Sequence, residues 1–172
     1  MIFLTGGARS GKSALAARLV ADSPSVRLIV TARADDDEMH ARIRRHQEDR
    51  LSSWVTIEEP EEVVDAVYAA SSEESVILDC VTIWVSNLMA EHDDDHILEQ
   101  VGLVARALAD RPALSVVVSN EVGSGLVPMS EVGRRFRDLH GFANQEFSAR
   151  AESAFLVVAG RSLALGDIAD VR

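Results

Sequence analysis

The segment that most constrains the fold of this chain is a glycine-rich loop close to its beginning. Residues 6–13 are Gly-Gly-Ala-Arg-Ser-Gly-Lys-Ser and match the pattern G-x-x-x-x-G-K-S. The apolar residues 1–5 precede the loop and predict a buried strand, and the alanine- and leucine-rich residues 12–21 predict a helix. This pattern, placed between a strand and a helix, favours a phosphate-binding loop over a chance match in a glycine turn.

Each part of the loop has a chemical role in phosphate binding. Glycines allow backbone N–H groups to curl around phosphate oxygens, Lys12 can reach the β- and γ-phosphates, and the Ser13 hydroxyl can ligate Mg²⁺. Lys12 is also the only lysine of the chain, whose other cations are arginine. The predicted nucleotide-binding residues of the loop are Gly6, Gly7, Ala8, Arg9, Ser10, Gly11, Lys12 and Ser13.

A second candidate metal ligand is Asp79, which ends the apolar run of residues 75–79. An acid at the end of a neighbouring strand helps to hold Mg²⁺ in many proteins with such loops. The alternative is an ordinary strand-end acid that caps the next helix, and the position favours the metal role. The chain has no N-K-x-D guanine motif, which disfavours a regulatory GTPase.

Apolar strands alternate with helical segments along the rest of the chain, which predicts an α/β fold with a mostly parallel sheet covered by helices on both faces. We expect one P-loop NTPase-like domain over residues 1–172 with a closing antiparallel hairpin. The predicted strands are residues 26–31, 54–57, 75–79, 114–119, 155–158 and 163–165. The predicted helices after the first are residues 36–51, 60–70, 81–90, 96–109 and 130–151.

The charge of the chain excludes several classes of protein. The net charge is −11, which argues against a protein that binds nucleic-acid backbone. The positive balance of residues 1–34 nevertheless suggests an anionic ligand near the loop. One cysteine excludes an intrachain disulfide. There is no apolar run of membrane-spanning length and no leader segment, so we expect a soluble, cytoplasmic protein.

The predicted helix over residues 36–51 places one histidine among arginines. Arg42, Arg45, His46 and Arg50 follow a spacing that puts them along one side of the helix. Nearby arginines depress the pKa of an imidazole and favour its neutral, nucleophilic form. A solvated helix face on which His46 has no function explains the same spacing, and from spacing alone it is the better explanation.

Several further segments occur together and in order. They are Asp36-Asp37-Glu38-Met39 with Ala41-Arg42-Ile43 and His46, then Trp54, then Asn120-Glu121-Val122-Gly123-x-Gly125-x-Val127-Pro128, then Phe136-Arg137-Asp138 with Gly141 and Asn144-Gln145. With the loop they span residues 5–145. In these segments the chain resembles the bifunctional adenosylcobinamide kinase/adenosylcobinamide-phosphate guanylyltransferase family of cobalamin biosynthesis.

The resemblance implies two reactions at one site. A nucleotide γ-phosphoryl group, from GTP or ATP, goes to the aminopropanol hydroxyl of adenosylcobinamide. A histidine then takes GMP from GTP as a covalent intermediate and passes it to the phosphorylated corrinoid. His46 holds the matching position as nucleophile, with Lys12 as the second catalytic residue and Mg²⁺ held by Ser13 and Asp79. The resemblance adds nucleotide contacts at Thr31, Ala32, Arg33, Gln47, Glu48, Asp49, Arg50, Glu58 and Asp79.

The resemblance also implies a homo-oligomer, a trimer in this family, with adenosylcobinamide and its phosphate as substrates. Residues 81–96 are shorter and more acidic than the family pattern, which leaves the corrinoid-facing surface undefined. Two alternatives remain. One is a small-molecule kinase that uses the loop without guanylyltransferase activity, and the other is a non-catalytic GTP-binding regulatory module.

Overall fold

The computed structural model describes residues 1–33 and 54–167. Its centre is a seven-stranded sheet with the order β3-β2-β4-β5-β1-β6-β7. All neighbouring strands are parallel except β6 and β7, which form an antiparallel hairpin. The strands are β1 (Ile2–Thr5), β2 (Val26–Val30), β3 (Trp54–Glu58), β4 (Ser75–Asp79), β5 (Ser115–Val118), β6 (Ser153–Val158) and β7 (Arg161–Leu165).

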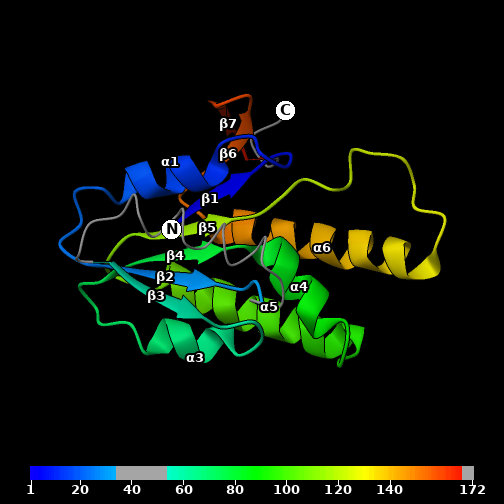
Figure 1. The fold of residues 1–172 in the computed structure, drawn as a ribbon, viewed down its shortest axis with the longest axis horizontal. Helices are drawn as coiled ribbons and strands as arrows, with labels where there is room; N and C mark the ends of the chain where they lie inside the picture. Colours follow the sequence, from blue (N-terminus) through cyan, green and yellow to red (C-terminus); the bar gives the residue numbers. More distant parts are fainter. Residues whose placement is uncertain (34–53, 168–172) are drawn as a thin grey trace.

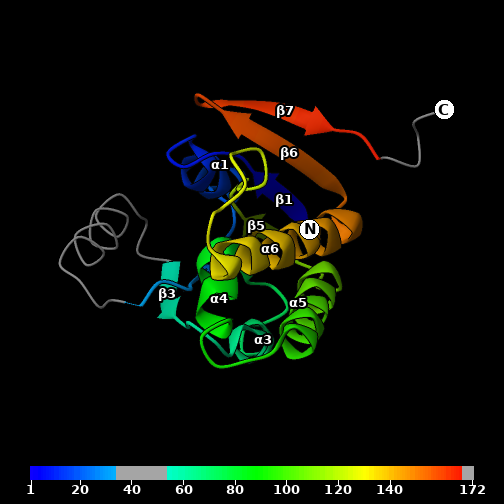
Figure 2. The same ribbon diagram turned by 90° about the vertical axis from the view of Figure 1, so that its right-hand side faces the viewer.

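Helices cover both faces of this sheet (Figures 1 and 2). Helix α1 lies on one face, and α3, α4, α5 and α6 lie on the other. The α/β fold with a parallel sheet, helices on both faces and a closing hairpin is therefore confirmed. The helices are α1 (Lys12–Leu19), α3 (Val63–Tyr68), α4 (Val81–Leu88), α5 (Asp94–Ala109) and α6 (Glu131–Arg150).

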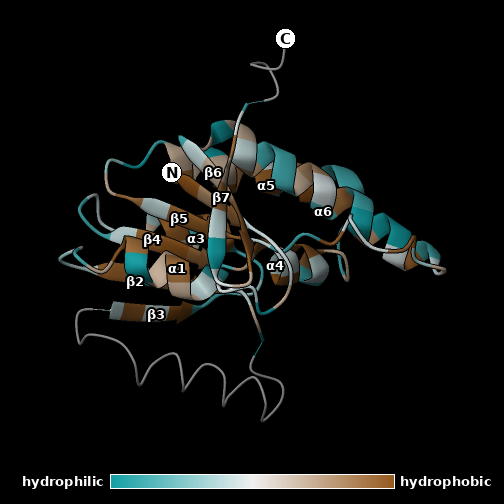
Figure 3. Ribbon diagram, turned by 90° about the horizontal axis from the view of Figure 1, so that it is seen from above, coloured by the Kyte–Doolittle hydropathy of each residue, from teal (hydrophilic) through white to brown (hydrophobic). Residues whose placement is uncertain are grey.

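The strands alternate their side chains between two cores, as the pleat of a strand requires. On β1, Phe3 packs into the core under the four helices, whereas Leu4 packs against α1. On β4, Leu78 and Ile77 divide in the same way. Figure 3 shows hydrophobic residues concentrated on the central strands and hydrophilic residues along much of α6. Both faces of the central strands β1, β2, β4 and β5 are therefore buried, which explains why these strands are continuous apolar runs.

The helix predicted over residues 60–70 begins later than expected, at Val63. The Glu59 carboxylate accepts hydrogen bonds from the backbone N–H groups of Glu61 and Glu62, at 3.0 and 2.9 Å. The carbonyl of Pro60 accepts from the Asn87 amide on α4 at 3.0 Å. These bonds hold the backbone before Val63 outside the helix.

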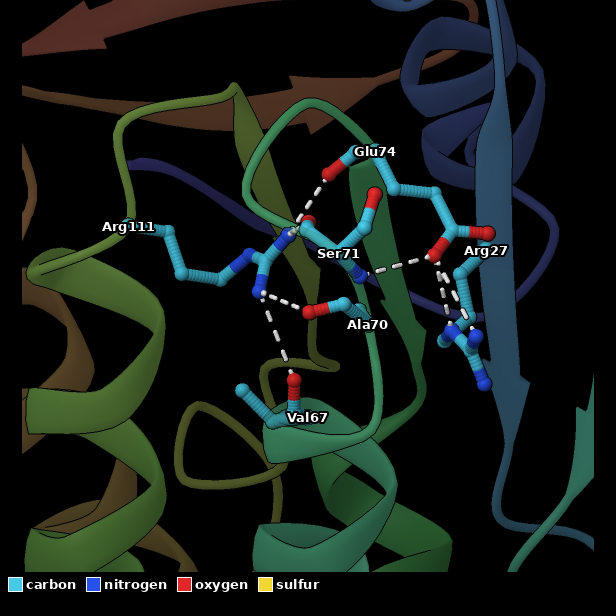
Figure 4. Close-up of polar contacts among 6 residues, drawn as sticks. All are labelled: Arg27, Val67, Ala70, Ser71, Glu74 and Arg111. Carbon is cyan, nitrogen blue, oxygen red and sulfur yellow. Dashed lines mark hydrogen bonds and ion pairs between the residues drawn. The ribbon is translucent and has the colours of Figure 1, made fainter.

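A charged cluster lies at the amino-terminal edge of the sheet (Figure 4). Arg111, just before β5, donates to the backbone carbonyls of Val67, Ala70, Ser71 and Glu74, at 2.6–3.4 Å. The Glu74 carboxylate in turn binds the Arg27 guanidinium of β2 at 3.2 Å and the N–H of Ser71. The cluster fixes the connection from α3 to β4 against the start of β5.

In the described part of the chain, none of the helices combines the length and the apolar character that crossing a membrane requires.

Candidate active site

The predicted site residues of the described chain gather at the carboxyl ends of the parallel strands. The loop of residues 6–13 follows β1, which lies between β5 and β6 in the sheet. Thr31 follows β2, and Asp79 ends β4. In open α/β sheets this edge is where ligands bind.

The backbone of the loop has three residues in the left-handed region. Gly6 has φ 143°, Arg9 has φ 57° and Gly11 has φ 106°. A Cβ on Gly6 would lie 2.1 Å from the carbonyl oxygen of Val157 on β6, so this position requires glycine. The loop thus takes the curled backbone that its glycines predicted.

Lys12 occupies the centre of this loop. Its side chain is buried, and Nζ donates to the carbonyl oxygens of Gly6 and Gly7 at 2.8 and 2.7 Å and to the Ser10 hydroxyl at 3.4 Å. These are neutral oxygens, whereas phosphate oxygens carry charge and form stronger bonds with an ammonium group. A phosphate group bound in the loop would therefore compete well with these oxygens for the Lys12 ammonium.

Two distant segments of the chain support the loop from either side. The N–H of Glu121, beyond β5, donates to the Gly6 carbonyl at 3.0 Å. The N–H of Gly160, in the β6–β7 turn, donates to the Ser10 carbonyl at 2.8 Å. Neither contact can be predicted from the sequence, because each joins residues that are far apart in the chain.

The ends of β2 and β4 are joined by Thr31. Its buried hydroxyl donates to the Cys80 carbonyl at 2.7 Å and accepts from the Cys80 N–H at 3.0 Å, and its own N–H donates to the Asp79 carbonyl at 3.1 Å. Burial, with a smaller effect of the Asp79 carboxylate, raises the pKa of the Cys80 thiol. The thiol therefore stays protonated at neutral pH, which makes it a poor nucleophile.

Asn87 on α4 organises the next part of this edge. Its amide donates to the carbonyl of Thr31 at 2.8 Å as well as to that of Pro60. Beside it, the exposed Arg33 guanidinium pairs with the Glu61 carboxylate. Ala32, between Thr31 and Arg33 in the chain, is buried. Glu58 is the last residue of β3, and its side chain is exposed.

Five predicted residues of the site lie outside the described residues. They are His46, Gln47, Glu48, Asp49 and Arg50. The predicted helix over residues 36–51 lies there as well.

Solved structures with similar folds have little sequence identity to this chain. The RadB recombinase matches with a TM-score of 0.52 at 13% identity, over 90% of this chain and 72% of that chain. A protein described as Project ID PH0250 from Pyrococcus horikoshii OT3 matches with a TM-score of 0.55 at 12% identity, over 99% of this chain and 87% of that chain. These similarities support the P-loop NTPase-like fold.

Proteins related by sequence share a much higher identity with this chain. The bifunctional adenosylcobalamin biosynthesis protein CobU of Escherichia coli (strain K12) is 39% identical over 93% of this chain and 96% of its own length. The protein CobP of Pseudomonas aeruginosa, with the same description, is 37% identical over 94% of this chain and 95% of its own length. The family model described as cobinamide kinase / cobinamide phosphate guanyltransferase matches residues 2–165. The loop of residues 6–13 lies at the ligand-binding edge of the sheet, and the family model covers nearly the whole chain. The chain therefore belongs to this family.

Proposed function

We propose that this chain catalyses both reactions of its family at the described loop, with His46 as the nucleophile of the second. The observation that carries the proposal is the family match over residues 2–165, combined with a loop whose only lysine lies over its carbonyl oxygens. The substrates are adenosylcobinamide, its phosphate, and GTP, with ATP as a possible donor in the first step.

In the first reaction the aminopropanol hydroxyl attacks the γ-phosphorus. A new O–P bond forms, the bond between the γ-phosphorus and the bridging oxygen breaks, and the nucleoside diphosphate leaves. The protein contributes mainly position and charge to such a transfer. Lys12 and the N–H groups of the loop hold the phosphates, and the segments around Glu121 and Gly160 hold the loop.

In the second reaction a nitrogen of the His46 imidazole attacks the α-phosphorus of GTP. An N–P bond forms, the α–β phosphoanhydride bond breaks, and pyrophosphate leaves. A phosphate oxygen of the phosphorylated corrinoid then attacks the same phosphorus and displaces the histidine. A covalent intermediate divides one difficult transfer into two easier ones.

The residues at this edge fit a magnesium ion that is bound together with a nucleotide. Ser13 lies in the first turn of α1 and Asp79 at the end of β4, and both offer oxygen ligands of the type that Mg²⁺ prefers. No group of three or more His, Cys, Asp or Glu side chains in the described residues could hold a metal ion. Phosphate oxygens and water would complete the coordination, and the ion would neutralise charge on the leaving group.

The proposal is tested by incubating the protein with Mg²⁺ and GTP labelled at the α-phosphate. We expect label that stays on the protein, is lost in mild acid and survives base, because the bond is a phosphoramidate. His46→Ala should abolish the label and the GMP-bearing product while it leaves phosphorylation of adenosylcobinamide largely intact.

His40→Ala is the matched control, because His40 lies six residues earlier in the same predicted helix. This variant should label like the wild type. Label that persisted in His46→Ala but disappeared in His40→Ala would move the nucleophile to His40. Phosphorylation without label in the wild type would instead favour a kinase that lacks the second activity.

A further inference from the structure

A buried polar network lies behind the phosphate loop and uses residues to which neither the sequence nor the proposed mechanism assigns a role. His140 on α6 is completely buried, and its Nε2 lies 3.0 Å from the Thr82 hydroxyl and 3.1 Å from the Ser119 hydroxyl. Asn144, one helical turn further along α6, accepts from the Ser119 hydroxyl at 2.6 Å. The network therefore joins α6 to α4 and to the end of β5.

The hydrogen bonds of this network determine where its protons lie. The Asn144 amide donates to the Asn120 carbonyl at 3.1 Å, so its oxygen is the acceptor that faces Ser119. Ser119 consequently uses its hydroxyl proton on Asn144 and can only accept from His140. The imidazole thus carries its proton on Nε2, and its buried Nδ1 has no hydrogen-bond partner among the described residues.

Burial keeps this ring neutral. It lowers the pKa of His140 from its usual 6.5 to about 4, and the Glu121 carboxylate acts in the opposite direction. The ring also packs against Phe136, with ring centroids 5.6 Å apart. His140 is a fixed hydrogen-bond donor in this arrangement, because a second proton on Nδ1 would be buried without an acceptor.

The network continues to the phosphate loop through the backbone. The Thr82 hydroxyl also accepts from the N–H of Asn120 at 2.9 Å. The next residue, Glu121, donates its N–H to the Gly6 carbonyl, and this same carbonyl accepts from Lys12 Nζ. Thr82 on α4 thus holds the N–H of Asn120, and Asn144 on α6 holds its carbonyl. The N–H of the next residue contacts the loop.

We propose that His140, with Thr82, Ser119 and Asn144, is a positioning unit that sets the Gly6 carbonyl and so the place of the Lys12 ammonium for the nucleotide phosphates. His140 touches no substrate in this proposal and acts through residues 119–121. The inference rests on the proposed function in that the bound ligand is a nucleoside triphosphate.

The test compares the affinity for GTP with Mg²⁺, measured by calorimetry at pH 7.5, across several variants of the full chain. We expect His140→Leu and Ser119→Ala to weaken binding about tenfold each, with the double variant no weaker than His140→Leu, because both break one connected unit. His140→Gln places an amide N–H near the position of Nε2–H and should restore affinity to within about twofold of the wild type.

Leu108→Ala is the control for a general loss of packing. Leu108 is completely buried on α5 and takes no part in the network, so this variant should lower the melting temperature and leave the affinity for GTP unchanged. Equal weakening in Leu108→Ala and His140→Leu would overturn the positioning role. Wild-type affinity in His140→Leu would overturn it as well.

The test remains decisive if His140→Leu does not fold. Ser119→Ala and Thr82→Val each remove one hydroxyl from the network, and wild-type affinity in both would reject the inference. A wild-type chain that binds no GTP would instead reject the proposed function. The two failures therefore give different results.

Discussion

The two edges of the parallel sheet both carry polar clusters, but they use charge in opposite ways. At the amino-terminal edge, Arg111 and Arg27 are bound by fixed protein oxygens, four backbone carbonyls and the Glu74 carboxylate. At the carboxyl-terminal edge, Lys12 lies over neutral oxygens of the loop, and the groups that support the loop form a neutral network around His140.

This difference is what we expect between a charge that stabilises the fold and a charge that binds a ligand. The Arg27 guanidinium is already paired with the Glu74 carboxylate and therefore gains little from an added anion. The hydrogen bonds that Lys12 makes within the loop go to neutral oxygens, and charged phosphate oxygens would bind its ammonium more strongly. The predictions below break one edge at a time.

The largest effect is expected from Lys12→Ala. Both proposed reactions have a polyphosphate leaving group that needs this cation, so each should lose on the order of 10²-fold or more in turnover. Turnover of adenosylcobinamide phosphorylation and formation of labelled protein are the measurements. Arg18→Ala, an exposed position on the same helix, is the control with near-normal rates. Near-normal turnover of Lys12→Ala in either reaction would refute a shared site.

Arg111→Ala should have the opposite profile. It removes charge-assisted hydrogen bonds to carbonyls between α3 and β4, and we expect a loss of about 2–3 kcal/mol in the free energy of unfolding. Urea denaturation measures this loss, and calorimetry should find the affinity for GTP unchanged in the folded protein. Arg111→Lys keeps the charge but not the planar fork, so its stability should lie between the two. A clear loss of GTP affinity in folded Arg111→Ala would mean that the two edges are coupled.

The smallest of the three effects is the response of stability to pH. His140 has a folded-state pKa of about 4, below the usual value of 6.5, so between these values the unfolded chain binds a proton that the folded chain does not. The contribution of the neutral His140 to the free energy of unfolding is therefore fully present above pH 6.5, and it decreases as the pH falls towards 4. Between pH 7.5 and pH 5 the wild type should lose about 2 kcal/mol more than His140→Gln. An equal loss of unfolding free energy in the wild type and in His140→Gln between the two pH values would contradict a neutral, buried imidazole.

Local features of the sequence predicted the parts of the molecule that depend on local physics. The glycines and Lys12 determine the phosphate loop, because its φ angles need glycine and its chemistry needs an ammonium. Asp93 begins the run of three aspartates and caps α5 by accepting the His96 N–H, so that the helix begins at Asp94, two residues before the predicted start. The continuous apolar runs predicted the central strands within one or two residues.

The supports of the site could not be predicted in this way. The network joins residues 82, 119, 140 and 144, which the sheet order and helix packing bring together. His140 resembles any other helix histidine in the sequence, and only its burial distinguishes it. Conversely, Asn120-Glu121-Val122-Gly123 is part of one of the segments that carry the resemblance to the family. Within this segment the Glu121 carboxylate accepts the Gly123 N–H at 2.6 Å.

The contact between the β6–β7 turn and the phosphate loop has a consequence for how the protein is made. A ribosome synthesises a chain from its N-terminal side, so the loop emerges before Val157 and Gly160, which approach it closely and hydrogen-bond to it. A nascent chain without β6 holds the residues of the loop but lacks the contacts of Val157 and Gly160 on one side of it. The loop is therefore held on this side only when the hairpin docks beside β1, so its final geometry depends on a segment that is synthesised much later.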